Sequence, residues 1–451
     1  MTNVAVVGLG KLGAPLAVVL ASKGHDVIGI DLSDRTVQLV NEGRAPVDEP
    51  GLQELISVHR SRLRATTDLG AAAEADISIL LVPTPSTDSG AFSNEHVLAA
   101  TDAIGKSLAG ASASHLLVVG STVMPGSCDS EVLPLLEQAS GRRVGETLGL
   151  CYSPEFIALG TVLRDLVAPD MVLIGESDRA AGDALERLYR GVCENNPPFR
   201  RMSLLNSELT KIAVNTYVTM KISYANTLAD ICERLDGADS DTVADALGLD
   251  SRIGPKYLRG ATAYGGPCFP RDTKAFAALA RDVHVEPLLA EATDAVNSIR
   301  IDRLAQVTQS HLADGASVGI LGLAYKPGTS VVDESAGVAL AGVLADAGYD
   351  VHVYDPVVDG ETVPEIAGMV RCSRSLDEIF RDCDVVVITT PWPEFSALSA
   401  EALRSSTPRR RVVIDCWRVL SEPTYANEID IVRLGRRQSS LLELHGLKGS
   451  R

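Results

Sequence analysis

The feature that most constrains the fold is a glycine-rich turn near the start of the chain. Gly8, Gly10 and Gly13 form a Gly-x-Gly-x-x-Gly pattern directly after an apolar run at residues 4–7, and a helical pattern follows. In this context backbone amides can approach a pyrophosphate at the amino terminus of a helix. Asp31 ends the next apolar run, where a carboxylate can bind both ribose hydroxyls of NAD. The sequence therefore predicts a dinucleotide-binding α/β domain.

The same acid indicates which dinucleotide binds. Asp31 would repel the 2′-phosphate of NADP, so we expect NAD. Arg35 follows four residues later and would suit that phosphate, but beside Asp31 we interpret it as a surface residue or one that stacks on adenine. A tight strand–helix turn can also exist without a ligand, but the combination of strand, glycines, helix and acid favours a cofactor.

Apolar runs divide the chain into two strand-rich parts. In the first 200 residues, short β-branched runs alternate with helical stretches, which is typical of a parallel sheet covered by helices on both faces. These runs lie at Val4–Val7, Asp26–Ile30, Ile77–Val82, Leu116–Val119, Leu150–Tyr152 and Met171–Gly175. The alternation resumes near the carboxyl end, at Ser317–Leu321, Asp350–Tyr354, Val385–Thr389, Val412–Asp415 and Ile429–Leu434.

The segment between these parts has a helical pattern. Residues 203–245 contain neither Gly nor Pro before Gly237, which predicts one long helix, and more helix is expected near 275–312. We therefore predict two Rossmann-like, doubly wound α/β domains joined by a long central helix and a helical middle region. The expected divisions are 1–200 for the NAD-binding domain, 201–300 for the middle region and 301–451 for the second α/β domain. Residues 436–451 have little periodicity and are expected to fray.

Charge and cysteine usage limit the partners. Lys and Arg total 41 against 59 Asp and Glu, a net charge of −18, which opposes general binding to nucleic acid or anionic membranes. The 8 cysteines form no Cys-x-x-Cys pair, which argues against structural zinc and favours a reducing compartment. The apolar amino terminus lacks the basic segment of a signal peptide, and the apolar runs are too short to span a membrane. We expect a cytoplasmic protein without a metal ion.

The most informative segment of the sequence is Tyr264–Asp272. Two glycines precede Cys268, so a tight, exposed turn can present its sulfur to a ligand. Asp272 follows four residues later and could orient a water or a cation. A lone cysteine is more often a small core residue, so spacing alone leaves the role of Cys268 open.

Gly-Gly-Pro-Cys-Phe-Pro-Arg-Asp at 265–272 resembles the active-site cysteine motif of the UDP-glucose/GDP-mannose dehydrogenase family, the nucleotide-sugar dehydrogenases. Further segments are similar to that family in the same order over nearly the whole chain. They are Arg44–Leu52, Pro83–Pro85, Ser121–Val123, Ser153–Phe156, Glu208-x-x-Lys211-x-x-x-Asn215, Arg252–Pro255, Leu323–Lys326 and Tyr354–Pro356. Several ordered matches are far more specific than any one of them.

The resemblance implies an NAD-dependent, four-electron oxidation of the C6 alcohol of a nucleotide sugar to a uronic acid. Cys268 would add to the intermediate aldehyde as a thiohemiacetal, which is oxidised to a thioester and then hydrolysed. Glu155 would serve the hydrolysis, with Thr122 and Asp272 placing a water. Lys211 and Asn215 lie four residues apart on one helix, so an ammonium and an amide can stabilise charge on a sugar oxygen.

The implied binding residues fall into two sets. The cofactor set is Gly8, Gly10, Leu12, Gly13, Asp31, Arg35, Pro83, Thr84, Ser121 and Thr122. The substrate set is Glu155, Phe156, Lys211, Asn215, Arg252, Tyr257, Tyr264, Gly265 and Lys326, with Arg252 reaching a sugar site across a dimer. Structural alternatives stay open: Lys211 and Asn215 as a solvated helix face, Glu155 as a helix cap, and Arg252 and Lys326 as surface cations.

Three positions depart from the family pattern. Leu159 stands where many members have a second glutamate after Pro-Glu-Phe, and Asp333 stands where they have an arginine. Trp417 takes the arginine position of an Asp-x-Arg motif, with Arg418 one residue later, able to compensate only if the loop shifts. These departures put contacts with the sugar and contacts of the second α/β domain in doubt.

The leading hypothesis is a nucleotide-sugar 6-dehydrogenase of polysaccharide biosynthesis, with UDP-glucose as the default substrate, NAD as cofactor and a homodimer as the expected assembly. The sequence does not choose between nucleotides or sugars, because pocket shape decides this. One alternative is a two-electron hydroxyacid dehydrogenase, against which Cys268 and the second α/β domain argue. The other is a non-catalytic protein that binds NAD and a nucleotide sugar.

Overall fold

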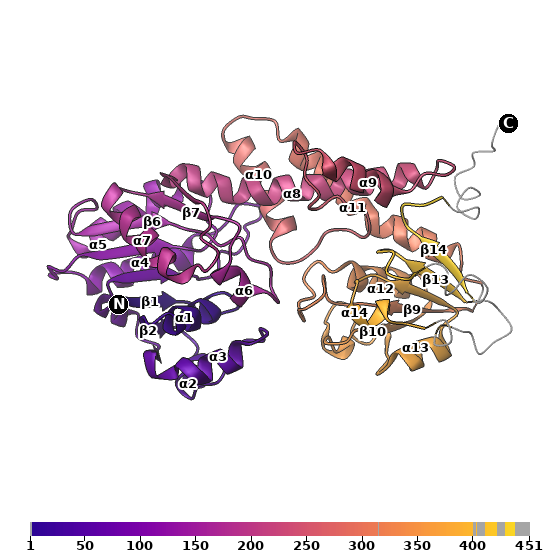
Figure 1. Ribbon diagram of the computed structural model, residues 1–451, viewed down its shortest axis with the longest axis horizontal. Coiled ribbons are helices and arrows are strands. Elements are labelled where there is room, and N and C mark those ends of the chain that lie inside the picture. The colour runs from indigo at the N-terminus through magenta and orange to yellow at the C-terminus, as the bar shows by residue number, and fades with distance from the viewer. Residues whose placement is uncertain (1, 314, 400–402, 404–410, 422–428, 438–451) are drawn as a thin grey trace. The chain divides into compact units, whose positions relative to one another are not determined.

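The computed structural model describes residues 2–313, 315–399, 403, 411–421 and 429–437. The chain forms two compact units (Figure 1). The first comprises Met1–Val214 and Ala278–Val285, and the second Asn215–Ala277 and Glu286–Arg451. The boundary lies inside one long helix, α8 (Leu204–Cys232).

The first unit contains an eight-stranded sheet with the order β3-β2-β1-β4-β5-β6-β7-β8. Neighbouring strands are parallel except for the antiparallel pair β6 and β7. The strands are β1 (Asn3–Val7), β2 (Asp26–Ile30), β3 (Leu63–Thr66), β4 (Ile77–Leu80), β5 (His115–Val119), β6 (Leu148–Tyr152), β7 (Val172–Glu176) and β8 (Phe199–Ser203). The first six follow the order of a dinucleotide-binding fold, which confirms the predicted class.

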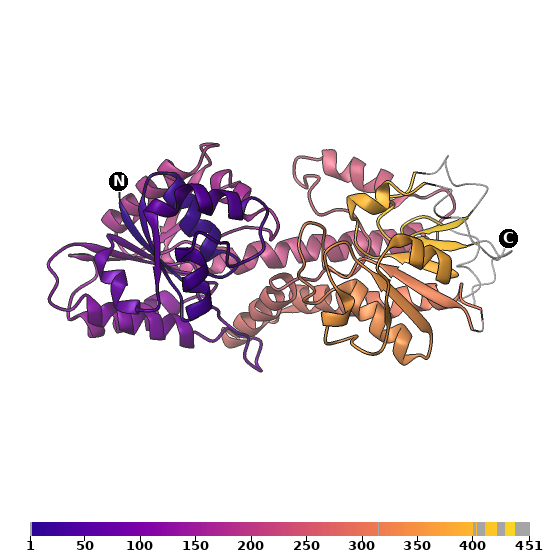
Figure 2. The same ribbon diagram turned by 90° about the horizontal axis from the view of Figure 1, so that it is seen from below.

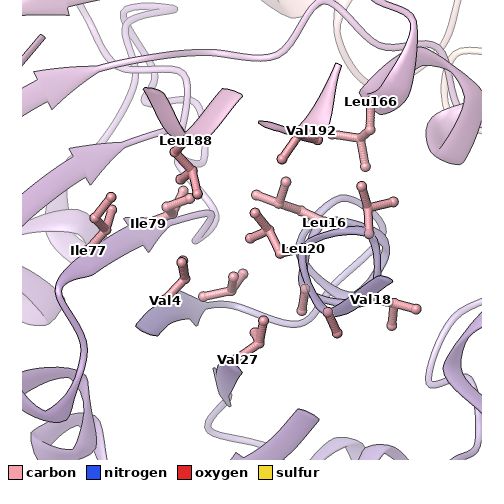
Figure 3. Close-up of a cluster of buried hydrophobic side chains, with 14 of the residues drawn as sticks. Val4, Leu16, Val18, Leu20, Val27, Ile77, Ile79, Leu166, Leu188 and Val192 are labelled. Atoms are coloured by element: carbon pink, nitrogen blue, oxygen red, sulfur yellow. The ribbon is translucent and has the colours of Figure 1, made fainter. Parts of the chain in front are cut away.

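Helices cover both faces of this sheet, which Figure 2 views close to edge-on. The helices are α1 (Gly13–Ser22), α2 (Asp34–Asn41), α3 (Leu52–His59), α4 (Glu95–Ser107), α5 (Leu133–Ser140), α6 (Val162–Val167) and α7 (Arg179–Val192). Shorter helical turns are η1 (Arg60–Arg62), η2 (Leu69–Glu74) and η3 (Cys128–Val132). Because successive strand residues point to opposite faces, Val4 and Val6 of β1 join a core with α1, α6 and α7, whereas Ala5 and Val7 pack with α4 and α5. Figure 3 shows Val4 in the first of these cores, near Leu16 and Leu20 of α1.

The second unit contains a six-stranded, fully parallel sheet with the order β11-β10-β9-β12-β13-β14. Its strands are β9 (Ser317–Leu321), β10 (Asp350–Tyr354), β11 (Arg371–Cys372), β12 (Val385–Ile388), β13 (Val412–Asp415) and β14 (Asp430–Arg433). Its helices are α12 (Ala336–Asp346), η4 (Gly360–Thr362), α13 (Leu376–Asp382) and α14 (Pro393–Ser396). Buried residues of α11 (Leu288–Gln309) and α12 cover one face, and those of α13 and α14 the other. This second α/β domain was also predicted.

The middle region consists of helices. After α8 come α9 (Ser240–Leu249), α10 (Phe269–Asp282) and α11 (Leu288–Gln309). The prediction of one helix over 203–245 is wrong, because α8 ends at Cys232 and a turn precedes α9. The carboxylate of Glu233, just after α8, accepts a hydrogen bond from the amide of Gly435 (2.8 Å) and pairs with Arg303 of α11. These tertiary contacts fix the chain just after α8, where the helix does not continue.

Within the described ranges, no helix combines the length and the apolar character needed to cross a membrane. The expected fraying of residues 436–451 falls, from residue 438 onward, outside the described residues.

Candidate active site

The glycine-rich turn joins β1 to α1 and leaves one position open. A Cβ atom on Gly13 would lie 1.7 Å from the carbonyl oxygen of Gly8, and one on Gly8 would lie 2.4 Å from that of Leu81. These two glycines are therefore required for the close packing of strand and helix. A Cβ on Gly10 would meet no protein atom within 4 Å, so a ligand can approach the backbone there.

Asp31 follows β2 and faces the same turn. Its Oδ2 accepts a hydrogen bond from the amide of Leu9 (2.8 Å) and its Oδ1 from that of Ser33 (2.9 Å). The side chain is partly exposed, and with two bonds made, its oxygens keep lone pairs for ribose hydroxyls. Arg35 is exposed in the first turn of α2. Leu12 is the residue before α1 and packs against the core, so its backbone rather than its side chain is what it can offer.

The loops after β4 and β5 are tied together by buried hydroxyls. Ser121 Oγ donates to the carbonyl of Val82 (2.8 Å) and accepts from the Val82 amide (2.9 Å). Thr84 Oγ1 donates to the carbonyl of Thr122 (2.7 Å). Ser121 and Thr84 therefore shape this edge of the sheet, whereas Pro83 is exposed and Thr122 partly exposed. With Gly10 and Asp31, the geometry fits a dinucleotide at the carboxyl ends of the strands.

Glu208 of α8 fixes the turn that follows Thr122. Its buried carboxylate accepts hydrogen bonds from the amides of Gly126 (2.6 Å) and Cys128 (2.8 Å). Burial raises the pKa of this carboxyl. Glu208 thus positions a loop, although in the sequence it stands beside Lys211 and Asn215 in one motif.

Glu155, Phe156 and Lys211 lie together in the first unit. Lys211 is buried; its ammonium donates to the backbone carbonyl of Glu155 (2.6 Å) and lies 4.8 Å from the centre of the Phe156 ring. Burial raises the pKa of Glu155 to about 7, opposed by a hydrogen bond from Tyr189 and by the charge of Lys211. The Tyr189 hydroxyl donates to Glu155 Oε1 (3.2 Å). A carboxyl that titrates near neutrality is suited to general base catalysis.

Two of the structural alternatives do not hold for these residues. Lys211 and Asn215 are each only 8% exposed, so they are not a solvated helix face. Glu155 does not cap a helix: Glu49 accepts the amides of Gly160 (3.0 Å) and Val162 (2.7 Å) at the start of α6.

Leu159 packs against the apolar core of the first unit. The family's second glutamate is thus replaced here by a hydrophobic contact.

Cys268 is exposed and directly precedes α10 in the second unit. The Asp272 amide donates to its carbonyl (2.8 Å), so the cysteine occupies the first turn. The positive end of a helix dipole stabilises negative charge such as a thiolate. In the same turn of α10, Asp272 Oδ2 accepts a hydrogen bond from Asn215 Nδ2 (2.6 Å), and Asp272 Oδ1 lies 3.4 Å from Arg271 Nε. The buried pair Asn215 and Asp272 fixes α10 against α8.

Two asparagines clamp the chain that leads to Cys268. Asn297 of α11 accepts the amide of Tyr264 (2.8 Å) and donates to its carbonyl (3.1 Å). Asn226 of α8 accepts the amide of Ala261 (2.8 Å) and donates to the carbonyl of Thr262 (3.2 Å). Neither asparagine was singled out from the sequence, because a side-chain-to-backbone clamp between distant segments has no local pattern. The same is true of Tyr189.

The remaining substrate candidates lie in the second unit. Tyr257 and Tyr264 both meet the edge of the Phe269 ring, at centroid distances of 6.2 and 6.5 Å. Arg252 has an exposed side chain that pairs with Asp250 (2.6 Å). The ammonium of Lys326 lies 5.9 Å from the centre of its neighbouring tyrosine ring.

Arg418 does not take the place of the arginine that Trp417 replaces. Its guanidinium is buried, pairs with Asp241 of α9 (2.6 Å) and donates to the carbonyls of Cys416 and Leu434. Trp417 donates its indole N–H to the carbonyl of Thr389 (2.7 Å). Arg418 therefore stabilises the second unit, and in this structure it does not compensate for the missing arginine.

Comparison with known proteins gives concordant results. Three family models of the UDP-glucose/GDP-mannose dehydrogenase family match: the NAD binding domain at residues 2–193, the central domain at 205–299 and the UDP binding domain at 319–422. UDP-glucose 6-dehydrogenase AglM of Haloferax volcanii is 37% identical over 93% of this chain and 97% of that protein. A GDP-mannose 6-dehydrogenase of Pseudomonas savastanoi pv. phaseolicola is 32% identical over 92% and 95%. The structure of a UDP-glucose dehydrogenase from Pyrobaculum islandicum superposes with a TM-score of 0.87 at 32% identity, covering 97% of this chain and 98% of that one.

Proposed function

The chain belongs to the UDP-glucose/GDP-mannose dehydrogenase family, and from this premise we propose that it oxidises UDP-glucose at C6 to the uronic acid through a thioester on Cys268. It is an NAD-dependent nucleotide-sugar 6-dehydrogenase; the choice of UDP-glucose and the covalent mechanism are the proposal. The observation that carries the mechanism is an exposed cysteine at the amino terminus of α10, held on a clamped turn.

The chemistry balances as follows. NAD, when bound, accepts one hydride equivalent in each of two oxidations. The alcohol becomes an aldehyde, the Cys268 thiol adds to it as a thiohemiacetal, and oxidation of that adduct leaves a thioester. Water then breaks the carbon–sulfur bond, releasing the carboxylate and returning the thiol.

The roles of the polar residues follow from their surroundings. The Lys211 ammonium lies against the Glu155 carbonyl and the Phe156 ring, and a cation held there is suited to stabilise a developing alkoxide. Glu155, with its pKa near 7, is the proposed base that activates the hydrolytic water. Asp272 and Asn215 hold the first turn of α10, and Thr122 is proposed to help place the water. The cofactor residues and the other substrate residues named from the sequence keep their proposed roles.

We propose UDP as the nucleotide because the third family model is a UDP binding domain. We propose glucose as the sugar because the relative at 37% identity is a UDP-glucose 6-dehydrogenase. GDP-mannose is the second candidate, because a GDP-mannose 6-dehydrogenase is 32% identical to this chain.

We further propose a homodimer. Tyr217, Tyr224 and Ile231 of α8 recur every seventh residue and are 56%, 56% and 50% exposed. Residues at this spacing lie on one face of a helix, and such an apolar stripe is suited to pack against a second copy.

The eight free cysteines suit the proposed cytoplasmic location, and a uronic acid product suits polysaccharide synthesis. The three-domain division at 200 and 300 also stays a proposal, supported by the limits of the three family models.

The test is the stoichiometry of the reaction. Purified protein with NAD and a panel of nucleotide sugars should form two NADH per UDP-glucose, with the uronic acid identified by mass. Cys268→Ala should lower this activity by orders of magnitude and keep NAD affinity, because the Gly8–Gly13 turn is unchanged. One NADH per sugar with an aldehyde as the final product, or acid formation by Cys268→Ala at near the normal rate, would disprove the thioester mechanism. Faster turnover of GDP-mannose would replace the substrate.

A further inference from the structure

The second sheet repeats the turn geometry of the first. A Cβ atom on Gly337 of α12 would lie 1.9 Å from the carbonyl oxygen of Gly322, which follows β9. The corresponding distance from Gly13 to Gly8 is 1.7 Å. The strand order around β9 is also that around β1. Both domains therefore begin with a strand and a helix that meet at two glycines.

The acid at the end of the second strand is used differently. In the first domain Asp31 accepts hydrogen bonds from the amides of Leu9 and Ser33 and is partly exposed. Its counterpart Asp355, directly after β10, is buried and accepts five. The donors are the amides of Leu323 (2.7 Å), Ala324 (3.0 Å), Val357 (2.9 Å) and Val358 (3.0 Å) and the indole of Trp392 (3.1 Å). Because a carboxylate has about four acceptor sites, Asp355 has none left for a ribose.

The segment between Gly322 and Gly337 is also much longer than the turn between Gly8 and Gly13. It lies instead against the cysteine turn. The amide of Gly266 donates to the carbonyl of Asp333 (2.9 Å), and a Cβ on Gly265 would lie 2.1 Å from the carbonyl oxygen of Glu334. A Cβ on Gly266 would lie 2.6 Å from Cε2 of Tyr325. The Tyr325 ring thus packs directly on the turn, two residues before Cys268.

We propose that Tyr325 is a positioning residue for Cys268, and that the β9–α12 segment serves to hold the cysteine turn rather than to bind a dinucleotide. The importance for turnover rests on the proposed function; the positioning itself does not. The Tyr325 amide donates to the carbonyl of Val331 (2.9 Å), which closes the segment behind the ring. Burial, and then the charges of Cys268 and Asp333, raise the pKa of the Tyr325 hydroxyl, which places this ring close to the cysteine.

The first test measures the thiol directly. The rate at which iodoacetamide alkylates Cys268 is followed against pH by peptide mass spectrometry in the wild type, Tyr325→Ala and Tyr325→Phe. We expect Tyr325→Ala to move the midpoint of the alkylation profile to higher pH, because the sulfur is no longer held at the helix terminus, and Tyr325→Phe to restore it. Cys193 of the first unit, partly exposed, is the internal control and should not change. Tyr349→Ala, in the same domain as Tyr325, is the control variant. Unchanged Cys268 profiles in all variants would overturn the proposal.

The second test is a double-mutant cycle. Gly266 has a φ of 84°, so alanine there carries backbone strain in both backgrounds, but its clash with the ring is relieved when Tyr325 is already Ala. Its effect on the alkylation rate should therefore be at least threefold smaller in the Tyr325→Ala background. Additive effects would overturn the proposal. In steady state, Tyr325→Ala should lower kcat tenfold or more with a KM change below threefold. Tyr325→Phe should keep a kcat within about twofold of the wild type. A wild-type kcat in Tyr325→Ala would also contradict the proposed positioning role. If alkylation and coupling behave as expected while the wild type forms only one NADH per sugar, the positioning stands and the thioester mechanism fails.

Discussion

At the scale of single residues, the proposed role of Glu155 as a base predicts a reaction that is sensitive to pH. Its pKa of about 7 means that the basic form grows as the pH rises through neutrality, so kcat should rise with it. Tyr189→Phe removes the hydrogen bond that lowers this pKa, and the midpoint of the kcat profile should move to higher pH. Tyr349→Phe, outside the site, should leave it in place. A Tyr189→Phe profile that moves down or stays fixed would contradict the assignment.

Glu155→Gln removes the proposed base, and Leu159 supplies no second carboxylate to replace it. We expect a covalent enzyme–sugar adduct to accumulate on Cys268, detected by intact mass, with hydrolysis slowed at least a hundredfold. Normal turnover by Glu155→Gln would show that another group carries out hydrolysis.

The same carboxyl affects stability, in the opposite direction to activity. The native state keeps a proton up to a pH of about 7 that the unfolded chain releases near 4.5, so the free energy of unfolding should fall as the pH rises between these values. The loss should be about 3 kcal/mol, because the two pKa values differ by about 2.5 and each pKa unit corresponds to about 1.36 kcal/mol. Urea titrations of the wild type and Glu155→Gln at several pH values measure it, and the Gln variant should lack this component. Equal slopes would show that Glu155 does not titrate in this range.

Asp31 and Asp355 provide a matched pair for cofactor choice. Asp31→Asn should weaken NAD binding and narrow the preference over NADP, because a ribose acceptor and a repulsive charge are both lost. Asp355→Asn should lower thermal stability, since five donors lose a charged partner, with the NAD to NADP ratio of dissociation constants unchanged. Cofactor titration and thermal unfolding distinguish the two. A ratio that is unchanged in Asp31→Asn would remove this residue from the cofactor site.

At the scale of elements, the β1–α1 turn separates packing from binding. Gly13→Ala should unfold the protein or cost several kcal/mol, because its Cβ would overlap a backbone oxygen. Gly10→Ala should fold with nearly wild-type stability, because its Cβ meets no protein atom, and should bind NAD at least tenfold more weakly. Denaturant titration and NAD titration of both variants check this. Normal NAD affinity in Gly10→Ala would place the pyrophosphate elsewhere.

The elements also mark what the sequence could reveal. Strands such as β1, β9 and β12 were predicted because both faces are buried and their residues are almost wholly apolar. The edge strands β3 and β8 were missed because they carry arginines and are only partly buried, and β11 has only two residues. The antiparallel pairing of β7 was equally hidden, since apolar runs carry no direction.

For the site, the motifs located most of the groups now named, because short-range spacing places Cys268 near Asp272 and Lys211 near Asn215. What they could not supply were partners from distant segments. Tyr189 and Tyr325 act through contacts that only the folded chain creates, and the two tyrosines have no local signature.

At the scale of the whole molecule, the apolar stripe of α8 predicts assembly. Tyr224→Asp should convert a dimer to a monomer, because a charge would be buried at the centre of the proposed interface. Val58→Asp, at a 72% exposed position on α3, should remain dimeric. Sedimentation velocity at micromolar concentration measures both. A monomeric wild type, or a Tyr224→Asp protein that stays dimeric, would refute this interface.

The closely packed glycines of the two sheets limit which amino-acid substitutions the chain can accept. Gly322 and Gly337 meet as closely as Gly8 and Gly13 do, although the acid beside them is occupied by the protein itself. Folding alone is therefore enough to require Gly322 and Gly337, whether or not the second domain binds a dinucleotide. Gly10 touches no neighbour, so only a ligand protects it from substitution. In a strand–helix turn of this kind, the glycine equivalent to Gly10 is therefore the position whose replacement would mark a domain that no longer binds the cofactor.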